Sequence, residues 1–175
     1  LFRSRLSEAR PDVALPFGGT RYETNILVEI AATAPRDCTA GDDGSIPLTA
    51  LLENTLAGLI EEGAVLDAEI AQTEAQRQAM WHRRELAAEI TIARQPTIDT
   101  DIALPLHLVP AFFAGIEARL PALDPGCDTL SVAHLGDGNI HYTVFPTRDD
   151  PALSDAVIEA VEDVVQDLGG SFSAE

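Results

Sequence analysis

Two of the four histidines in the chain flank a predicted β-turn, where they could bind a metal ion together. The run reads His134-Leu135-Gly136-Asp137-Gly138-Asn139-Ile140-His141, and an Asp-Gly pair between apolar segments is the strongest short-range signal of a β-hairpin. If Asp137 and Gly138 are the two central turn residues, His134 faces His141 directly. Opposed residues have Cβ atoms about 5 Å apart, so both imidazoles could reach one divalent ion through bonds of about 2.0–2.1 Å.

The same spacing also fits a structural histidine pair. The two rings could bond only to water or to the backbone, and a loop wider than two residues would change the register of the strands. From the spacing alone, a metal site and a structural pair both stay open.

The composition predicts a globular chain. It has 175 residues, 46% of them hydrophobic, and a mean hydropathy of +0.06. No apolar run approaches the 18 or so residues of a membrane span, and the first five residues do not build a signal peptide. Cys38 and Cys127 lack a CxxC spacing, so we expect free, buried thiols and a cytoplasmic protein.

The charge excludes some partners. The net charge is −18, from 29 acidic and 11 basic residues, which repels nucleic acids and anionic membranes. Every basic residue is an arginine. An anionic ligand must therefore be held by arginine, by a metal ion or by backbone amides.

Helices and strands alternate in the predicted pattern. Period-2 alternation predicts strands at 24–32, 66–70 and 98–104, and the hairpin adds strands at 128–135 and 139–145. Helical spacing predicts helices at 48–60, at 73–90, at 109–120 and at 151–168, before a last strand at 171–175. Ser45 is expected to cap the start of the first helix and Gly63 to end it. The capping-box pair Thr73 and Gln76 is expected to begin the second helix. Pro121 is expected to end the third helix and Asp150 to cap the start of the fourth.

This order favours an α+β fold. We expect a ferredoxin-like arrangement in duplicated form, with an antiparallel or mixed sheet and helices on one face. The chain has neither a GxGxxG turn nor a P-loop, so a nucleotide-binding Rossmann domain is not indicated.

The histidine run resembles a signature of FAD-linked oxidases and dehydrogenases. That branch holds D-2-hydroxyglutarate dehydrogenase, D-lactate dehydrogenase and the glycolate oxidase FAD subunit. Three further segments resemble motifs of this family in the same order, namely Trp81–Glu85, Asp101–Pro105 and Gly169–Glu175. The resemblance implies an oxidoreductase, a flavoprotein that uses FAD.

The resemblance also implies a domain organisation. Residues 1–22 would be an irregular lead-in from an FAD-binding domain that is missing here. Residues 23–175 would be the C-terminal substrate domain, cut short before a histidine often proposed as the catalytic base. We therefore expect a fragment that is inactive alone and binds no FAD.

Roles for individual residues follow from the resemblance. It implies that His134, His141 and Glu175 ligate a divalent metal, usually zinc, with the two histidines as the catalytic pair. Two imidazoles and a carboxylate leave a coordination position open for a 2-hydroxy acid. Arg84 would pair with the substrate carboxylate. Asn139 would orient a ligand or favour the turn, Arg83 would face solvent, and His82 would be structural.

Two departures from the family pattern bear on the substrate. Ala88 stands where the family often has Thr or Ser, and Asp99 stands where it often has Lys. Those positions help to grip the distal carboxylate of 2-hydroxyglutarate in that family, and Asp99 would repel it. We therefore expect a smaller or less charged 2-hydroxy acid, such as lactate or glycolate. For the family as a whole, the resemblance implies oxidation of a D-2-hydroxy acid to a 2-oxo acid.

Other functions and partners are also compatible with the sequence. The chain could be a stand-alone ferredoxin-like module that binds a metal or a small ligand, or an acidic domain that docks a partner. For the dehydrogenase, the expected partners are the 2-hydroxy acid, the FAD domain of the same chain and an electron acceptor that the sequence does not identify. That acceptor could place the protein at the membrane periphery, and a homodimer is compatible with the sequence.

Overall fold

Four segments with alternating apolar residues form one sheet in the computed structural model, which describes residues 6, 10–20 and 22–174. The strands are β1 (Ile98–Ala103), β2 (Asp128–His134), β3 (Asn139–Phe145) and β4 (Ser171–Ala174). They lie in the order β2-β3-β1-β4, and every neighbouring pair is antiparallel. With the connecting helices the order along the chain is β-α-β-β-α-β, which is ferredoxin-like. The predicted α+β class is confirmed.

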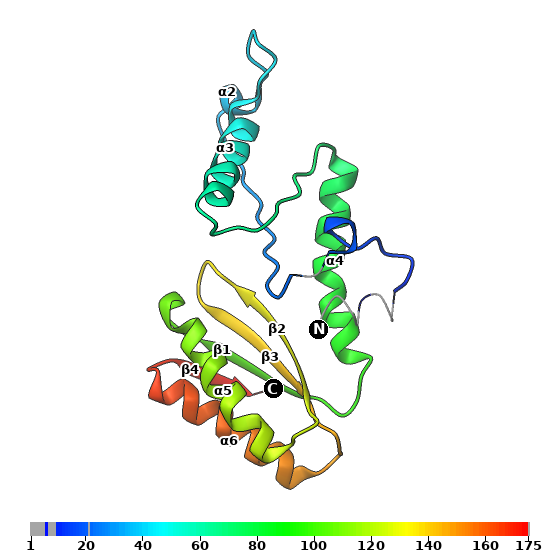
Figure 1. Cartoon of the computed structure of the whole chain (residues 1–175), viewed down its shortest axis with the longest axis vertical. Helices are drawn as coiled ribbons and strands as arrows, with labels where there is room; N and C mark the ends of the chain where they lie inside the picture. The colour runs from blue at the N-terminus through cyan, green and yellow to red at the C-terminus, as the bar shows by residue number, and fades with distance from the viewer. Residues whose placement is uncertain (1–5, 7–9, 21, 175) are drawn as a thin grey trace. The chain divides into compact units, whose positions relative to one another are not determined.

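Two helices cover one face of this sheet. Helices α5 (Val109–Leu123) and α6 (Pro151–Asp167) lie side by side on it, as Figure 1 shows. Between the layers, Phe112 is fully buried and its ring meets Tyr142 edge to face, with 5.4 Å between the ring centroids. Burial raises the pKa of the Tyr142 phenol to about 12. The core also includes Ile98, Ile102, Ile116, Ile140, Val144, Val157, Val161 and Val165.

The predictions of two further strands were wrong. Residues 24–32 and 66–70 are irregular, and Ile26, Val28 and Leu66 are 62%, 56% and 77% exposed. Alternation describes a strand only where a neighbouring strand completes its hydrogen bonds. Within the described residues, therefore, one β-α-β-β-α-β arrangement is present and no second copy accompanies it.

The helix ends agree with the sequence in part. Thr73 and Gln76 form the predicted capping box, and Asp150 Oδ1 accepts a hydrogen bond from the Ala152 amide at 3.0 Å. Two assignments were wrong. Helix α3 (Pro47–Glu61) begins at a proline, so the cap position falls on Ile46 rather than Ser45. Helix α5 continues through Pro121 to Leu123.

The chain divides into two units, Arg10–Glu85 and one built mainly from Leu86–Glu175 that contains the sheet. Helix α4 (Glu74–Ile92) contributes residues to both. The Arg10–Glu85 unit also contains a 3-10 turn η1 (Phe17–Gly19), helix α2 (Pro35–Cys38) and helix α3. The predicted boundary at residue 22 stays a prediction.

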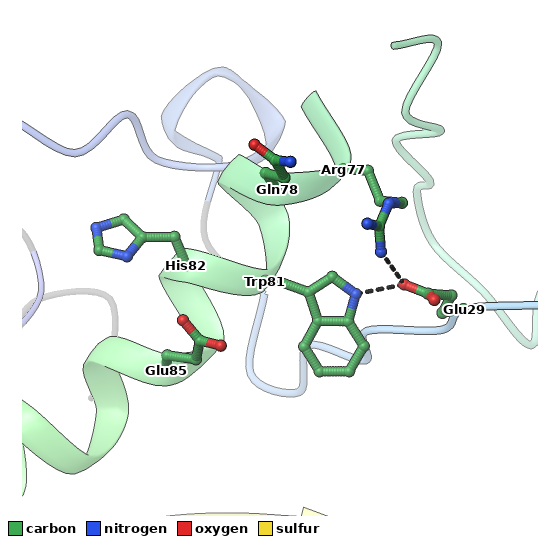
Figure 2. A pocket seen from close by; sticks show the side chains of 6 residues that line it. All are labelled: Glu29, Arg77, Gln78, Trp81, His82 and Glu85. Atoms are coloured by element: carbon green, nitrogen blue, oxygen red, sulfur yellow. Dashed lines mark hydrogen bonds and ion pairs between the residues drawn. The ribbon is translucent and has the colours of Figure 1, made fainter. Parts of the chain in front are cut away.

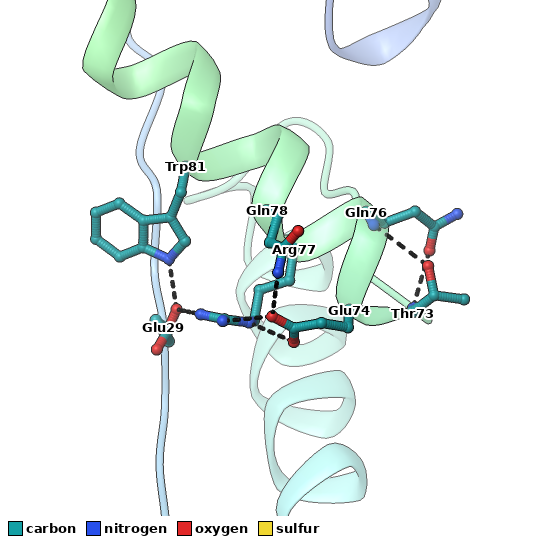
Figure 3. Close-up of polar contacts among 7 residues, drawn as sticks. All are labelled: Glu29, Thr73, Glu74, Gln76, Arg77, Gln78 and Trp81. Carbon is teal, nitrogen blue, oxygen red and sulfur yellow. Dashed lines mark hydrogen bonds and ion pairs between the residues drawn. The ribbon is translucent and has the colours of Figure 1, made fainter.

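Polar contacts tie the irregular segment around Glu29 to helix α4. The Trp81 indole N–H donates to the Glu29 carboxylate, and Arg77 Nη1 lies 2.9 Å from the same oxygen (Figure 2). These hydrogen bonds, with that of Trp81 the strongest influence, lower the pKa of Glu29. At the start of α4, Arg77 also donates hydrogen bonds from Nε and Nη2 to the Glu74 carboxylate (Figure 3). These hydrogen bonds lower the pKa of Glu74 to about 2. The segment around Glu29 is therefore attached to helix α4 by side-chain hydrogen bonds and does not pair with a strand.

One helical segment corrects the expectation about membrane spans. Within the described residues, Leu106–Leu123 is long and apolar enough to cross a membrane by length and composition alone. It comprises the turn η2 (Leu106–Leu108) and α5. In this structure its residues Phe112, Ile116 and Leu120 pack into the core against the sheet.

The two cysteines are free, as predicted, but they are not buried. Cys38 is exposed and Cys127 is half-buried. Partial burial, followed by the negative charges of Asp124 and Asp128, raises the pKa of the Cys127 thiol. This environment disfavours the reactive thiolate.

Asp124 stabilises the loop that follows β3. The carboxylate is 2% exposed and accepts hydrogen bonds from the Thr147 amide at 2.7 Å and from the Thr147 hydroxyl at 2.6 Å. The hydroxyl contact is the largest of the influences that lower the pKa of Asp124. Because the pKa is lower in the folded state, the associated stability is present above the unfolded pKa of about 3.9 and is lost as the pH falls through the folded value.

We expect Asp124→Asn to lower the free energy of unfolding by about 1.5–3 kcal/mol at pH 7, because a buried charge-assisted contact is lost. The difference from the wild type should shrink as the pH falls below about 4. Urea unfolding followed by circular dichroism at several pH values measures both effects. The exposed Asp149→Asn variant is the control, and an equal loss in the control would contradict the prediction.

Candidate metal and substrate site

The histidine hairpin has a wider loop than predicted. His134 pairs with Asn139, and His141 pairs with Val132. The loop therefore contains the four residues 135–138, closed by hydrogen bonds from the amides of Asp137 and Gly138 to the His134 carbonyl at 3.3 and 3.0 Å. Gly138 has a φ of 77°, which favours glycine. The predicted pairing of His134 with His141 was wrong by two positions.

The two histidines nevertheless share one face of the sheet. Side chains alternate with a period of two along a strand, so a shift of two positions keeps both rings on the same side. Their ring centroids are 5.5 Å apart with an interplanar angle of 80°. This face is opposite the one that packs on α5 and α6, because the neighbouring Ile140 and Tyr142 belong to the core. Both histidines are exposed and accessible to a ligand.

A carboxylate from the adjacent strand completes this arrangement. Asp101 on β1 is the register partner of His141, and its Oδ1 contacts His141 Nδ1. Two residues earlier on β1, Asp99 accepts a hydrogen bond of 2.6 Å from the Thr143 hydroxyl. Asp99, Asp101, Thr143 and His141 thus follow the same side of two neighbouring strands.

Two further predicted site residues are Asn139, which the structure describes, and Glu175, which it does not. Asn139 pairs with His134 and follows the same face, and its amide donates to Asp137 Oδ1 at 3.0 Å. It lies beside the histidines, and its contact with a substrate stays a prediction. Glu175 lies outside the described residues, and its role as a metal ligand stays a prediction as well. Among the residues described, no group of three or more His, Cys, Asp or Glu side chains could hold a metal ion.

Arg84 is half-buried on helix α4 and belongs to the Arg10–Glu85 unit. Its contact with the substrate carboxylate stays a prediction. Arg83 was expected to face solvent, and this was wrong. Its side chain is half-buried, and Nη1 donates to the Ala14 carbonyl at 3.2 Å. An arginine can reach a backbone carbonyl across a surface that its methylene groups cover.

A shallow hollow lies on α4 in the same unit, and Figure 2 shows the side chains that line it. His82 is exposed at its rim and Trp81 lies beside Glu29. Three of the lining side chains bond to one another, because the Glu29 carboxylate accepts hydrogen bonds from Arg77 and from the Trp81 indole N–H. The hollow is therefore part of the local packing of α4. Its lining residues are Glu29, Arg77, Gln78, Trp81, His82 and Glu85.

The sequence identifies Asp101 only as the first residue of the motif Asp101–Pro105 and predicts no role for it in the site. Its position opposite His141 depends on how β1 pairs with β3, and nothing local in either segment fixes that register. A histidine that binds a metal ion commonly donates its other ring N–H to a carboxylate. That rule predicts an acidic residue beside His141, although it does not say which one.

The fold and this face define a ferredoxin-like domain that exposes a histidine pair backed by a carboxylate. The family model described as "FAD linked oxidases, C-terminal domain" matches residues 40–175. The chain therefore belongs to the family of FAD-linked oxidase C-terminal domains.

Relatives with assigned names are consistent with this family. The chain is 33% identical over 121 residues to a D-2-hydroxyglutarate dehydrogenase of Xanthomonas citri pv. viticola, covering 66% of this chain and 25% of the relative. It is 33% identical over 128 residues to the enzyme of that name from Stutzerimonas stutzeri, covering 69% and 27%. A Schizosaccharomyces pombe protein, named provisionally as a mitochondrial D-lactate dehydrogenase, is 28% identical over 137 residues, covering 73% and 25%. The chain thus spans about a quarter of the length of these relatives.

Proposed function

We propose that this chain is the substrate- and metal-binding part of an FAD-dependent dehydrogenase that oxidises a D-2-hydroxy acid to a 2-oxo acid. The names of the relatives support the hydroxy-acid chemistry, and the family supports the use of FAD. The single observation that carries the proposal is the exposed pair His134 and His141 on one face of the sheet, 5.5 Å apart between ring centroids.

The spacing of this pair suits one shared metal ion. Metal–nitrogen bonds of about 2.0–2.1 Å at a tetrahedral angle put two imidazole centres roughly 5 Å apart. The separation of 5.5 Å is close to that figure. It also falls within the range of a plain edge-to-face contact, so the distance supports a metal without requiring one. We assign His134 and His141 as ligands, with Glu175 as the third.

The chain's own residues would then bind and orient the substrate. If His134 and His141 held a metal ion, the hydroxyl and carboxylate of a 2-hydroxy acid would bind to it, next to Asn139, the register partner of His134. Arg84 belongs to the Arg10–Glu85 unit, and its pairing with the substrate carboxylate stays a prediction. FAD, held mainly by another part of the protein, supplies the acceptor for the hydride from the substrate carbon. This chain alone is expected to bind no FAD and to oxidise no substrate.

The substrate within this class is proposed to be small. Asp99 places a carboxylate on the same face as His141, two residues along β1 from Asp101. A negative charge there disfavours a substrate with a second, distal carboxylate, and Ala88 offers no hydroxyl to hold one. The names of the bacterial relatives favour 2-hydroxyglutarate instead. A direct comparison of substrates is therefore the decisive experiment.

We expect the complete protein to reduce a dye with D-lactate or glycolate faster than with D-2-hydroxyglutarate, and to leave the L-acids unused. The Asp99→Lys variant should shift the kcat/KM ratio toward D-2-hydroxyglutarate by about tenfold, which corresponds to about 1.4 kcal/mol. Steady-state assays on a panel of D- and L-2-hydroxy acids measure both effects.

The Asp149→Lys variant is the matched control, because it makes the same change of charge at an exposed residue outside the hairpin. A preference of the wild type for D-2-hydroxyglutarate would overturn the proposed substrate. Absence of turnover with every 2-hydroxy acid, together with stoichiometric zinc, would favour the stand-alone binding module. The cytoplasmic location and the homodimer stay predictions, which cell fractionation and sedimentation would check.

A further inference from the structure

We infer that Asp101 is a positioning residue that holds the proton of His141 on Nδ1 and leaves Nε2 free to bind a ligand. The inference deepens the proposed function and rests on it for the identity of that ligand. Its physical basis is the contact between Asp101 Oδ1 and His141 Nδ1 across β1 and β3.

The strand register makes this contact specific. Asp101 and His141 are directly opposed residues of an antiparallel pair, so their side chains leave the sheet next to each other on the same face. The two side chains are 30% and 48% exposed. The pair therefore lies at the surface, where His141 remains accessible to a ligand while one ring nitrogen is occupied.

The contact decides which nitrogen is available. In a neutral imidazole one nitrogen carries hydrogen and the other is an acceptor. A carboxylate can only accept, so Asp101 requires the hydrogen of His141 on Nδ1. The lone pair is then on Nε2, the nitrogen that could bind a metal ion or accept a proton from a substrate hydroxyl. A carboxylate in this position also fixes the ring orientation.

The other acidic residue on this side of β1 is engaged differently. Asp99 accepts its hydrogen bond from the Thr143 hydroxyl at 2.6 Å. Asp99 has the same charge, strand and face as Asp101, but its register partner is Thr143 rather than His141. It is therefore a matched control that separates direct pairing from the general effect of a nearby negative charge.

The tautomer can be read directly by nuclear magnetic resonance. Long-range ¹H–¹⁵N correlation spectra of the ¹⁵N-labelled chain, recorded without metal at alkaline pH where imidazole is neutral, distinguish Nδ1–H from Nε2–H. We expect the Nδ1–H pattern for His141 in the wild type and in Asp99→Ala. We expect an averaged pattern in Asp101→Ala, because nothing then holds the proton on Nδ1. An Nε2–H pattern in the wild type, or an equal change in Asp99→Ala, would overturn the inference.

Zinc titration of the same proteins separates this inference from the proposed function. Asp101→Ala should weaken zinc binding by about 10- to 100-fold, the usual effect of losing a carboxylate behind a histidine ligand, and Asp101→Glu should restore part of it. If the wild type binds no zinc, the metal assignment fails, and the tautomer alone decides the role of Asp101. If zinc binds with the same affinity in wild type and Asp101→Ala, the positioning role is overturned although the metal assignment stands.

Discussion

Replacing His141 by alanine in the complete enzyme is expected to lower kcat/KM for its D-2-hydroxy acid by more than about 100-fold. Loss of a partner behind a metal ligand already costs about 10- to 100-fold, and His141 is assigned as a ligand itself. The variant removes one of two imidazoles that share the exposed face, and it leaves the Asp101 carboxylate without its histidine. Dye-reduction kinetics and the zinc content of the purified protein measure the effect together.

The two measurements should change together if the histidine acts through a metal. His134→Ala should give a loss of the same order, because both rings are assigned to one ion. His107→Ala is the matched control, since His107 is an exposed histidine on η2 outside the hairpin, and it should keep both activity and zinc. A His141→Ala enzyme with full activity, or one that loses activity while retaining full zinc, would contradict the proposed role.

The hairpin shows how far a local pattern can determine a site. Sequence reasoning assumed a two-residue turn at Asp137 and Gly138, whereas the structure has a loop of four residues. The shared face of His134 and His141 was still predicted correctly, because the side-chain period of two makes a shift of two positions harmless. A shift of one position would have separated them. The prediction of a shared face therefore required only that the number of loop residues be even, and it did not depend on the type of turn.

Contacts between segments that are distant along the chain could not be predicted in this way. The segment around Ile26 and Val28 alternates like β1, but β1 pairs with β3 and β4, whereas this segment is irregular in the structure. Likewise, the pairing of Asp101 with His141 depends on the register of β1 against β3. Local propensity predicts neither which segments become strands of the sheet nor the register of β1 against β3, because the packing of the whole unit determines which segments pair.

Gly138 is the residue of the loop with the largest expected effect on stability. Its φ of 77° is a conformation that L side chains rarely adopt. A Cβ added there would lie 1.9 Å from the Leu104 carbonyl oxygen, which is backbone and cannot rotate away. In addition, the Gly138 carbonyl accepts a hydrogen bond of 3.0 Å from the Leu104 amide, which ties the loop to the end of β1. Any substitution must therefore separate two backbone segments.

We expect Gly138→Ala to lower the free energy of unfolding by about 2–4 kcal/mol. The left-handed conformation alone costs an alanine roughly 1–2 kcal/mol, and the displaced contact with Leu104 adds a loss of the size typical for broken packing. Urea unfolding followed by circular dichroism measures the change. Gly136→Ala is the matched control in the same loop, because a Cβ at Gly136 meets nothing within 4 Å. Equal stability of the two variants would show that the loop adapts freely, and the histidines would then lack the rigid support that the proposed shared ligand requires.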